Sequence, residues 1–258
     1  MYRLGQQYLR KVPEITAIFW ITKILTTAMG ESTSDFFVFK INPYLAVILG
    51  GIGLVIALIL QFSVSKYVAW IYWFTVAMVA VFGTMVADVL HIQFGIPYLV
   101  STIFFAVVLT LVFIVWYKSE KTLSIHTIYN SRRELFYWAT VLATFALGTA
   151  AGDLTARTIG LGYFASGLLF AGIFAVPVID YWLGLNKIFT FWFAYVLTRP
   201  FGASFADWFG KSTHLTGLGY GDGLVVIVLS VLIILCVAYM TFNPSEVRHE
   251  HISHVSKS

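Results

Sequence analysis

Long apolar stretches recur along the chain and limit the folds that it can adopt. A helix of about 20 apolar residues is needed to cross a bilayer core of about 30 Å. The sequence holds eight segments of about this length, separated by short turns that contain Asn, Pro or Gly. They span residues 13–35, 44–64, 67–88, 97–117, 135–153, 163–183, 188–207 and 222–242. We therefore predict an all-α polytopic membrane protein with eight transmembrane helices.

The composition supports this fold class. Hydrophobic residues make up 59% of the 258 residues and charged residues only 11%, whereas about 25% of a typical soluble domain is charged. These values exclude a cytosolic enzyme and a disordered chain, and the lone Cys236 excludes an intramolecular disulfide. The net charge of +4 is explained by cytoplasmic loops rather than by a nucleic-acid partner. The expected partner is the lipid bilayer, and an oligomer stays open.

The distribution of basic residues predicts the orientation in the membrane. Eight crossings place both termini on one side, which would carry eleven lysines and arginines, whereas the other side carries Lys40 and Lys211. Positive loops face the cytoplasm, so we expect both termini there and a multi-pass location in the cell (inner) membrane. We treat residues 1–258 as a single membrane domain with a cytoplasmic loop at 118–130 and a polar tail at 244–258.

A fourfold internal repeat accompanies the apolar segments. Each odd-numbered segment contains a tryptophan, a glycine ten residues later and an aspartate five residues further on, and a tyrosine follows near the start of the next segment. The four sets are Trp20, Gly30, Asp35 and Tyr44; Trp73, Gly83, Asp88 and Tyr98; Trp138, Gly148, Asp153 and Tyr163; and Trp192, Gly202, Asp207 and Tyr220.

The repeats cover approximately residues 13–66, 67–117, 131–185 and 186–243. Because each repeat contains two crossings, all four share one orientation and form parallel two-helix repeats. The simplest packing is a pseudo-fourfold or two-plus-two bundle with the odd-numbered helices inside. We expect the tryptophans near the cytoplasmic interface and the glycines where helices approach closely.

The chain resembles a family of bacterial integral membrane proteins built of four tandem two-helix repeats of unknown function, often labelled uncharacterised membrane-anchored proteins. The resemblance is carried by the repeated tryptophan and by the stretches KVPEITAIFWITKILTTAMGE, SEKTLSIHTIYNSRRELFYWATVLATFALGTAAGD and LTRPFGASFAD. It implies a helical membrane fold and a membrane location, and it implies no activity.

The repeated aspartates are the first candidate functional residues, because ionisable groups inside a membrane are costly and usually serve function. They would lie in the outer third of the bilayer at helix C-termini, where the macrodipole disfavours a carboxylate. A shared cation site would compensate that cost. We therefore predict that Asp35, Asp88, Asp153 and Asp207 line a cation pathway and act as metal ligands. The alternative is that each aspartate caps the following turn or forms a separate ion pair.

Two of the odd-numbered helices carry further charges near their middle. Lys23 and Arg199 each need a carboxylate partner there, and Arg157 is expected to pair with Asp153 four residues earlier. A buried ion-pair network that fixes helix register is the alternative interpretation. The candidate pathway residues are Glu31, Asp35, Asp88, Asp153, Asp207, Lys23, Arg199 and Thr27, with the partners of Lys23 and Arg199 expected among Glu31, Asp35 and Asp207.

Five carboxylates against three cations in the apolar segments favour a cation or a proton as the transported species. Oxygen ligands suit hard ions such as Mn²⁺, Mg²⁺ or Ca²⁺ better than Zn²⁺ or Cu⁺. We predict a transporter or channel for a cation, either a hard divalent metal such as Mn²⁺ or a proton-coupled ion, with no resident cofactor. A structural or partner-assembly membrane protein and a transporter of a small organic ion are the alternatives. No nucleophile or metal triad is recognised, so we do not expect an enzyme.

Two further features are interpreted as local structure. His91, three residues after Asp88, is expected to be a solvated loop histidine, and a place in the cation site is the alternative. The glycine-rich run at 217–223 is expected to be a flexible outer turn in which Asp222 caps the last helix.

Overall fold

The structure is a computed structural model that describes residues 10–184 and 186–243. Its regular secondary structure is helical, and no strand occurs in these residues. The predicted polar tail at 244–258 lies outside them. The helices are α2 (Ala17–Lys40), α3 (Pro43–Ser63), α4 (Ala69–Ile92), α5 (Tyr98–Glu120), α6 (Ser131–Asp153), α7 (Gly162–Ile173), α8 (Ala175–Trp182), α9 (Lys187–Gly210) and α10 (Asp222–Phe242), with short turns η1 (Ile125–Thr127), η2 (Leu154–Thr158) and η3 (Thr213–Leu215).

Six helical stretches in the described residues are long and apolar enough to cross a membrane. They are α3, α4, α5, α6 with its extension to Thr158, the α7–α8 stretch, and α10. Helices α2 and α9 have 24 residues each but contain more polar side chains. Several long apolar helices are what a multi-pass membrane protein requires.

Asparagine side chains cap the N-termini of three helices, α3, α6 and α9; at α6 the Asn130 Oδ1 atom accepts a hydrogen bond from the Arg133 N–H at 2.9 Å. Asn42 Oδ1 accepts a hydrogen bond from the Tyr44 N–H at 3.0 Å, and Pro43 occupies the first helical position. Asn186 starts α9 in a similar way, because its Oδ1 accepts from the Ile188 N–H at 3.0 Å. These caps allow a long helix to follow a turn of only a few residues.

The sixth apolar segment differs from its prediction. We expected one helix over residues 163–183, whereas the structure has α7 and α8 with an interruption at Phe174. Pro177 supplies the physical reason, because it cannot donate a hydrogen bond to the carbonyl of Ile173, four residues earlier. Helix α9, in contrast, continues through Pro200 without a break.

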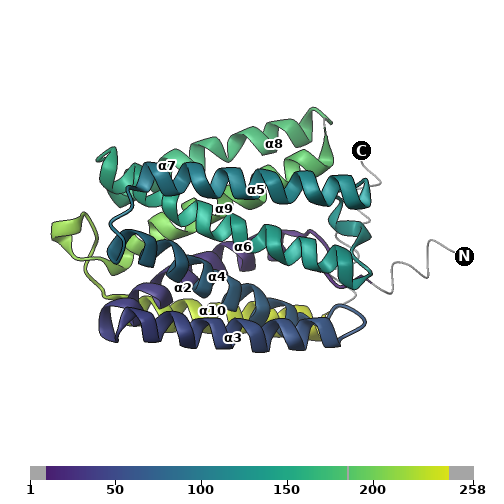
Figure 1. Cartoon of the computed structure of the whole chain (residues 1–258), viewed down its shortest axis with the longest axis horizontal. Helices are drawn as coiled ribbons and strands as arrows, with labels where there is room; N and C mark the ends of the chain where they lie inside the picture. Colours follow the sequence, from purple (N-terminus) through teal and green to yellow (C-terminus); the bar gives the residue numbers. More distant parts are fainter. Residues whose placement is uncertain (1–9, 185, 244–258) are drawn as a thin grey trace, which may run out of the picture.

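The first helices of the four repeats form the centre of the molecule. Figure 1 shows α5, α7 and α8 along one edge, α3 and α10 along the opposite edge, and α2, α4, α6 and α9 between them. In the centre, α2 and α6 each contact both α4 and α9. Each outer helix packs chiefly on the central helix of the next repeat: α3 on α4, α5 on α6, α7 on α9, and α10 on α2. The last repeat thereby contacts the first.

The repeated glycines lie at close contacts between neighbouring central helices. A Cβ atom at Gly30 would lie 2.4 Å from the Cβ of Ala80, and one at Gly148 would lie 2.2 Å from the Cγ of Arg199. A side chain at either position would therefore push two helices apart. The four glycine contacts are Gly30 with Ala80, Gly83 with Phe145, Gly148 with Arg199, and Gly202 with Thr27.

The N-terminal halves of the central helices meet in an aromatic cluster. Phe19 contacts Trp73 at 5.6 Å between ring centroids, and the Trp192 Nε1 atom donates to the Leu123 carbonyl at 2.9 Å. Three of the four repeated tryptophans, Trp73, Trp138 and Trp192, are buried in this cluster, and Trp20 is half-buried. These three tryptophans therefore pack between helices, whereas their depth near the cytoplasmic interface stays a prediction.

A buried polar cluster lies at the same end of the molecule, near the N-terminal ends of the central helices. The Lys11 Nζ atom lies 2.6 Å from Glu134 Oε2, and Gln61 donates to the other oxygen of this carboxylate at 2.8 Å. All three side chains are buried. Neither Lys11 nor Glu134 is among the candidate residues of the sequence analysis, so this contact was not predicted.

Candidate functional site

Arg199 lies at the centre of the molecule and is fully buried. From α9 its Nη1 atom donates to the carbonyl oxygen of Thr27 at 2.9 Å, and its Nη2 atom forms an ion pair with Glu31. Nη2 also donates to the hydroxyl oxygens of Thr84 in α4 and Thr149 in α6. One guanidinium group thus contacts the other three central helices. The expected pairing of Arg199 with a carboxylate of α2 is present.

Lys23 does not have the carboxylate partner that we expected. Its side chain is buried, and its Nζ atom has no hydrogen-bond partner among the described residues. The ammonium lies instead between two aromatic rings, 4.2 Å from the ring centroids of both Phe145 and Tyr195. Aromatic faces attract a cation, and they take the place of the predicted ion pair.

Three carboxylates gather near the C-terminal ends of α2 and α9. Glu31, Asp35 and Asp207 are each at least nine-tenths buried. One oxygen from each lies within 4.8 Å of the others, and among the described residues only these three acidic or metal-ligating side chains form such a group. The sequence explains the arrangement, because Glu31 and Asp35 are one helical turn apart on α2 and α9 packs against that helix.

Lys211 completes this group, and the sequence interpretation missed it. Its Nζ atom lies 2.5 Å from Asp35 Oδ2 and 3.9 Å from Asp207 Oδ1. We assigned Lys211 to the outer loops, whereas its side chain is only 7% exposed. Burial lowers the pKa of Lys211, but the carboxylates of Asp35 and Asp207 raise this pKa by more, so it lies above its usual value.

The loop after Lys211 folds back onto the end of α9. Leu218 donates its N–H to the Trp208 carbonyl at 2.6 Å, and Gly219 donates to the Lys211 carbonyl at 2.8 Å. The glycine-rich run is a turn before α10, as predicted, and these bonds satisfy carbonyls that a helix end leaves free. Its flexibility stays a prediction. The predicted role of Asp222 is wrong: α10 begins at Asp222 itself, and no side-chain hydrogen bond caps this helix.

The other two repeated aspartates have partners of their own. Ser34 Oγ donates to Asp88 Oδ2 at 2.7 Å, and the Arg157 Nε atom lies 3.1 Å from Asp153 Oδ1, as predicted for that pair. Asp88 and Asp153 are buried but do not belong to the three-carboxylate group. The structure therefore does not assemble the four repeated aspartates into one set of ligands.

The repeated tyrosines fall into two classes. Tyr98 and Tyr163 both accept hydrogen bonds from Arg157, at 3.1 and 3.0 Å. Tyr44 and Tyr220 are instead exposed, at 55% and 61%. The repeated tyrosine therefore has no single role in the four repeats.

His91 also differs from its prediction. It lies in the last turn of α4 rather than in a loop, and its Nδ1 atom is 2.6 Å from the Ile96 carbonyl oxygen. It is half-buried and does not belong to the three-carboxylate group.

The charges inside the molecule do not cancel. Outside the buried Lys11–Glu134 pair, which is neutral as a whole, five buried carboxylates face three buried cations and the 39% exposed Arg157, which leaves one negative charge in excess if all are ionised. The acidic residues are Glu31, Asp35, Asp88, Asp153 and Asp207, and the basic residues are Lys23, Arg157, Arg199 and Lys211.

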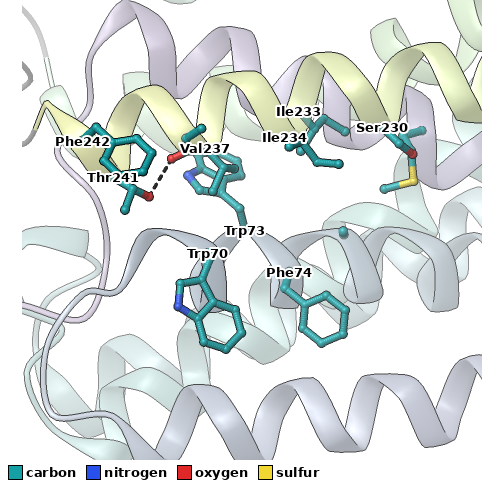
Figure 2. Close-up of a pocket in the computed structure, with 12 residues that line it drawn as sticks. Trp70, Trp73, Phe74, Ser230, Ile233, Ile234, Val237, Thr241 and Phe242 are labelled. Carbon is teal, nitrogen blue, oxygen red and sulfur yellow. Dashed lines mark hydrogen bonds between the residues drawn. The ribbon is translucent and has the colours of Figure 1, made fainter.

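An apolar groove lies away from these charges, between α4 and α10 (Figure 2). Its volume is about 520 Å³, and its lining includes Trp70, Trp73 and Phe74 of α4 and Ile233 and Val237 of α10. No charged side chain lines it. The groove therefore offers no charged ligand for an ion, and the three-carboxylate group remains the candidate site.

Comparison with known protein families finds a match to the family described as Repeat of Unknown Function (DUF347). The match covers residues 18–67, 71–122, 136–183 and 190–244, so four tandem copies of the repeat account for most of the chain. Each copy contains one central helix and the outer helix or helices that follow it. No curated protein and no solved structure matches the chain.

Proposed function

Because the chain belongs to the Repeat of Unknown Function (DUF347) family, whose description assigns no activity, we propose a function from the chemistry of the site. We propose that the protein moves a small cation across the membrane and that Glu31, Asp35 and Asp207 hold this cation on its way. The observation that carries the proposal is the approach of three buried carboxylates to within 4.8 Å of one another.

The proposal includes eight membrane crossings arranged as four parallel two-helix repeats. Helices α2 and α9 are then the two additional spans, since 24 residues make a helix about 36 Å long. Their polar side chains are compatible with a bilayer because they face other helices rather than lipid. Both termini lie in the cytoplasm in this arrangement, and the carboxylates lie toward the outer side of the cell membrane.

The chemistry of the three ligands favours a hard cation. Carboxylate oxygens bind Mn²⁺, Mg²⁺ and Ca²⁺ well, whereas soft ions prefer the sulfur of Cys or Met. Several carboxylates also neutralise the charge of a divalent ion better than one carboxylate would. We therefore favour a divalent ion, with Mn²⁺ as the practical probe.

The closed aromatic end supports transport rather than a simple pore. The cluster around Trp73 and Trp192 lies at the N-terminal ends of the central helices, whereas Asp35 and Asp207 lie near their C-terminal ends. A cation at the carboxylates would thus meet a packed aromatic layer on its path. Passage would require a second conformation in which this layer opens, as alternating access does.

A structural role is the second candidate, and one observation favours it. Arg199 contacts the other three central helices, as expected of a buried network that fixes helix register. In that case the carboxylates would serve only to neutralise the positive charges of Arg199 and Lys211. Transport measurements separate the two functions.

The experiment is Mn²⁺ uptake into liposomes that contain the purified protein. Asp207→Asn should abolish uptake, because it removes one ligand charge while keeping the shape of the side chain. Asp180→Asn is the matched control, because Asp180 lies far from the site. Asp180 accepts a hydrogen bond from Thr190, and Thr190 lies about 25 Å along α9 from Asp207. Normal uptake by Asp207→Asn, or no uptake by the wild type with Mn²⁺, Mg²⁺ or Ca²⁺, would leave the structural role.

A further inference from the structure

The ammonium of Lys211 already places one positive charge at the proposed cation site. Its Nζ atom lies 2.5 Å from Asp35 Oδ2 and 3.9 Å from Asp207 Oδ1. We infer that Lys211 is a tethered competitor: its ammonium occupies the carboxylates when no cation is bound, and the transported cation must displace it to enter. This inference rests on the proposed function and concerns the regulation of the same site.

One lysine does not satisfy the three carboxylates. Asp207 is 4% exposed, and its Oδ1 atom has no hydrogen-bond partner among the described residues. The Lys211 ammonium, at 3.9 Å from this oxygen, is beyond hydrogen-bond distance. A buried carboxylate oxygen without a donor is costly. A divalent ion that contacted Asp207 together with Glu31 and Asp35 would remove this cost. Replacement of the lysine ammonium by such an ion is therefore favourable at Asp207.

The two cations near the carboxylates differ in how easily they could leave. Arg199 is held by hydrogen bonds to three other helices. Lys211 is a point charge on a flexible stem and is held through Asp35 and, more weakly, Asp207. Its Nζ atom also lies 5.0 Å from the ring centroid of Phe39, which is 60% exposed. This ring offers the displaced ammonium an attractive surface away from the site.

The backbone of Lys211 is held by hydrogen bonds that do not involve its side chain. Gly219 donates its N–H to the Lys211 carbonyl at 2.8 Å. The loop packs so closely that a Cβ atom at Gly217 would lie 2.0 Å from the same carbonyl oxygen. A competitor anchored in this way stays at a high effective concentration beside the carboxylates. The site is therefore closed to weakly binding ions.

The test is Mn²⁺ binding to the purified full-length protein, measured by titration calorimetry. Lys211→Met removes the competing charge, so we expect it to bind Mn²⁺ about tenfold more tightly than the wild type does. Lys40→Met is the matched control, because Lys40 is an exposed lysine at the end of α2, and its Kd for Mn²⁺ should not change. Equal or weaker binding by Lys211→Met would overturn the inference.

A second measurement uses the wild type alone and does not depend on how the variant folds. If Mn²⁺ displaces the ammonium, then acetylation of Lys211, followed by mass spectrometry, should become faster when Mn²⁺ is added. Unchanged or slower acetylation would overturn the inference. If the wild type binds and transports Mn²⁺ but neither result appears, only the tethered competitor is refuted; if it binds and transports no cation, the proposed function is refuted as well.

Discussion

The ion pair between Arg199 in α9 and Glu31 in α2 is buried at the point where the four central helices meet. It joins the first repeat to the last, although 168 residues separate its members. Both side chains are buried away from water, so the charged form of each is stabilised by the opposite charge of the other. The ion pair thereby links the stability of the bundle to the carboxylates of the proposed cation site.

Arg199→Met should destabilise the protein strongly. The substitution leaves the Glu31 carboxylate buried without its cation, and breaking a buried pair in this way costs about 3–5 kcal/mol. Thermal unfolding of the purified protein in detergent measures the change. Arg132→Met is the control, because Arg132 is 66% exposed and should change stability by less than about 0.5 kcal/mol. A similar loss of stability in the two variants would contradict the inferred stabilising role of the Arg199–Glu31 ion pair.

Gly148→Ala tests the close contact of α6 with α9. The added Cβ would lie 2.2 Å from the Cγ and 2.5 Å from the Cβ of Arg199, and overpacking of this kind costs about 1–3 kcal/mol. Gly172→Ala is the matched control, since nothing lies within 4 Å of a Cβ atom at Gly172 in α7. That variant should keep or gain stability, by up to about 1 kcal/mol. Unfolding temperatures that fall equally for both would refute the contact.

Lys23→Met should stabilise the protein. The Lys23 ammonium is buried between two rings and has no hydrogen-bond acceptor among the described residues, and an unsatisfied buried polar group costs about 1–3 kcal/mol. Met has a similar length and carries no charge. A denaturant titration should therefore show a higher free energy of unfolding. A clear decrease would mean that the ammonium has a partner that these contacts do not reveal.

The helical fold was predictable because it depends on patterns that are local in the sequence. Apolar length and the spacing from Trp20 to Gly30 to Asp35 identified the helices and the repeat before any contact was known. The break at Phe174 was missed because a proline within an apolar run does not always interrupt a helix. Pro200 leaves α9 continuous, whereas α7 ends at Ile173, four residues before Pro177.

The site was predictable only in part because its partners come from different helices. Four-residue spacing placed Glu31 and Asp35 on one face of α2, and it also predicted the pair of Asp153 with Arg157. Equal spacing in the repeats suggested equal roles for the aspartates, yet Asp88 meets the Ser34 hydroxyl. Neighbours differ between repeats even where the repeated residue is the same.

Lys211 shows most clearly what a sequence pattern cannot supply. It follows the end of α9 and lies beyond the predicted apolar segment, where a cation is expected to be solvated. Its spacing of four residues from Asp207 was the available signal. The shorter contact with Asp35 comes from a different helix, so no local pattern predicts it.

The most direct test of the proposed site is to locate a bound cation. Crystals of the protein grown with Mn²⁺ should give an anomalous scattering peak at about 2.0–2.6 Å from oxygens of Glu31, Asp35 and Asp207, the range of distances for hard cations and oxygen ligands. The Lys211 ammonium should then have left Asp35. Saturating Mn²⁺ with no peak at these carboxylates, and with Lys211 still bound to Asp35, would contradict the cation site.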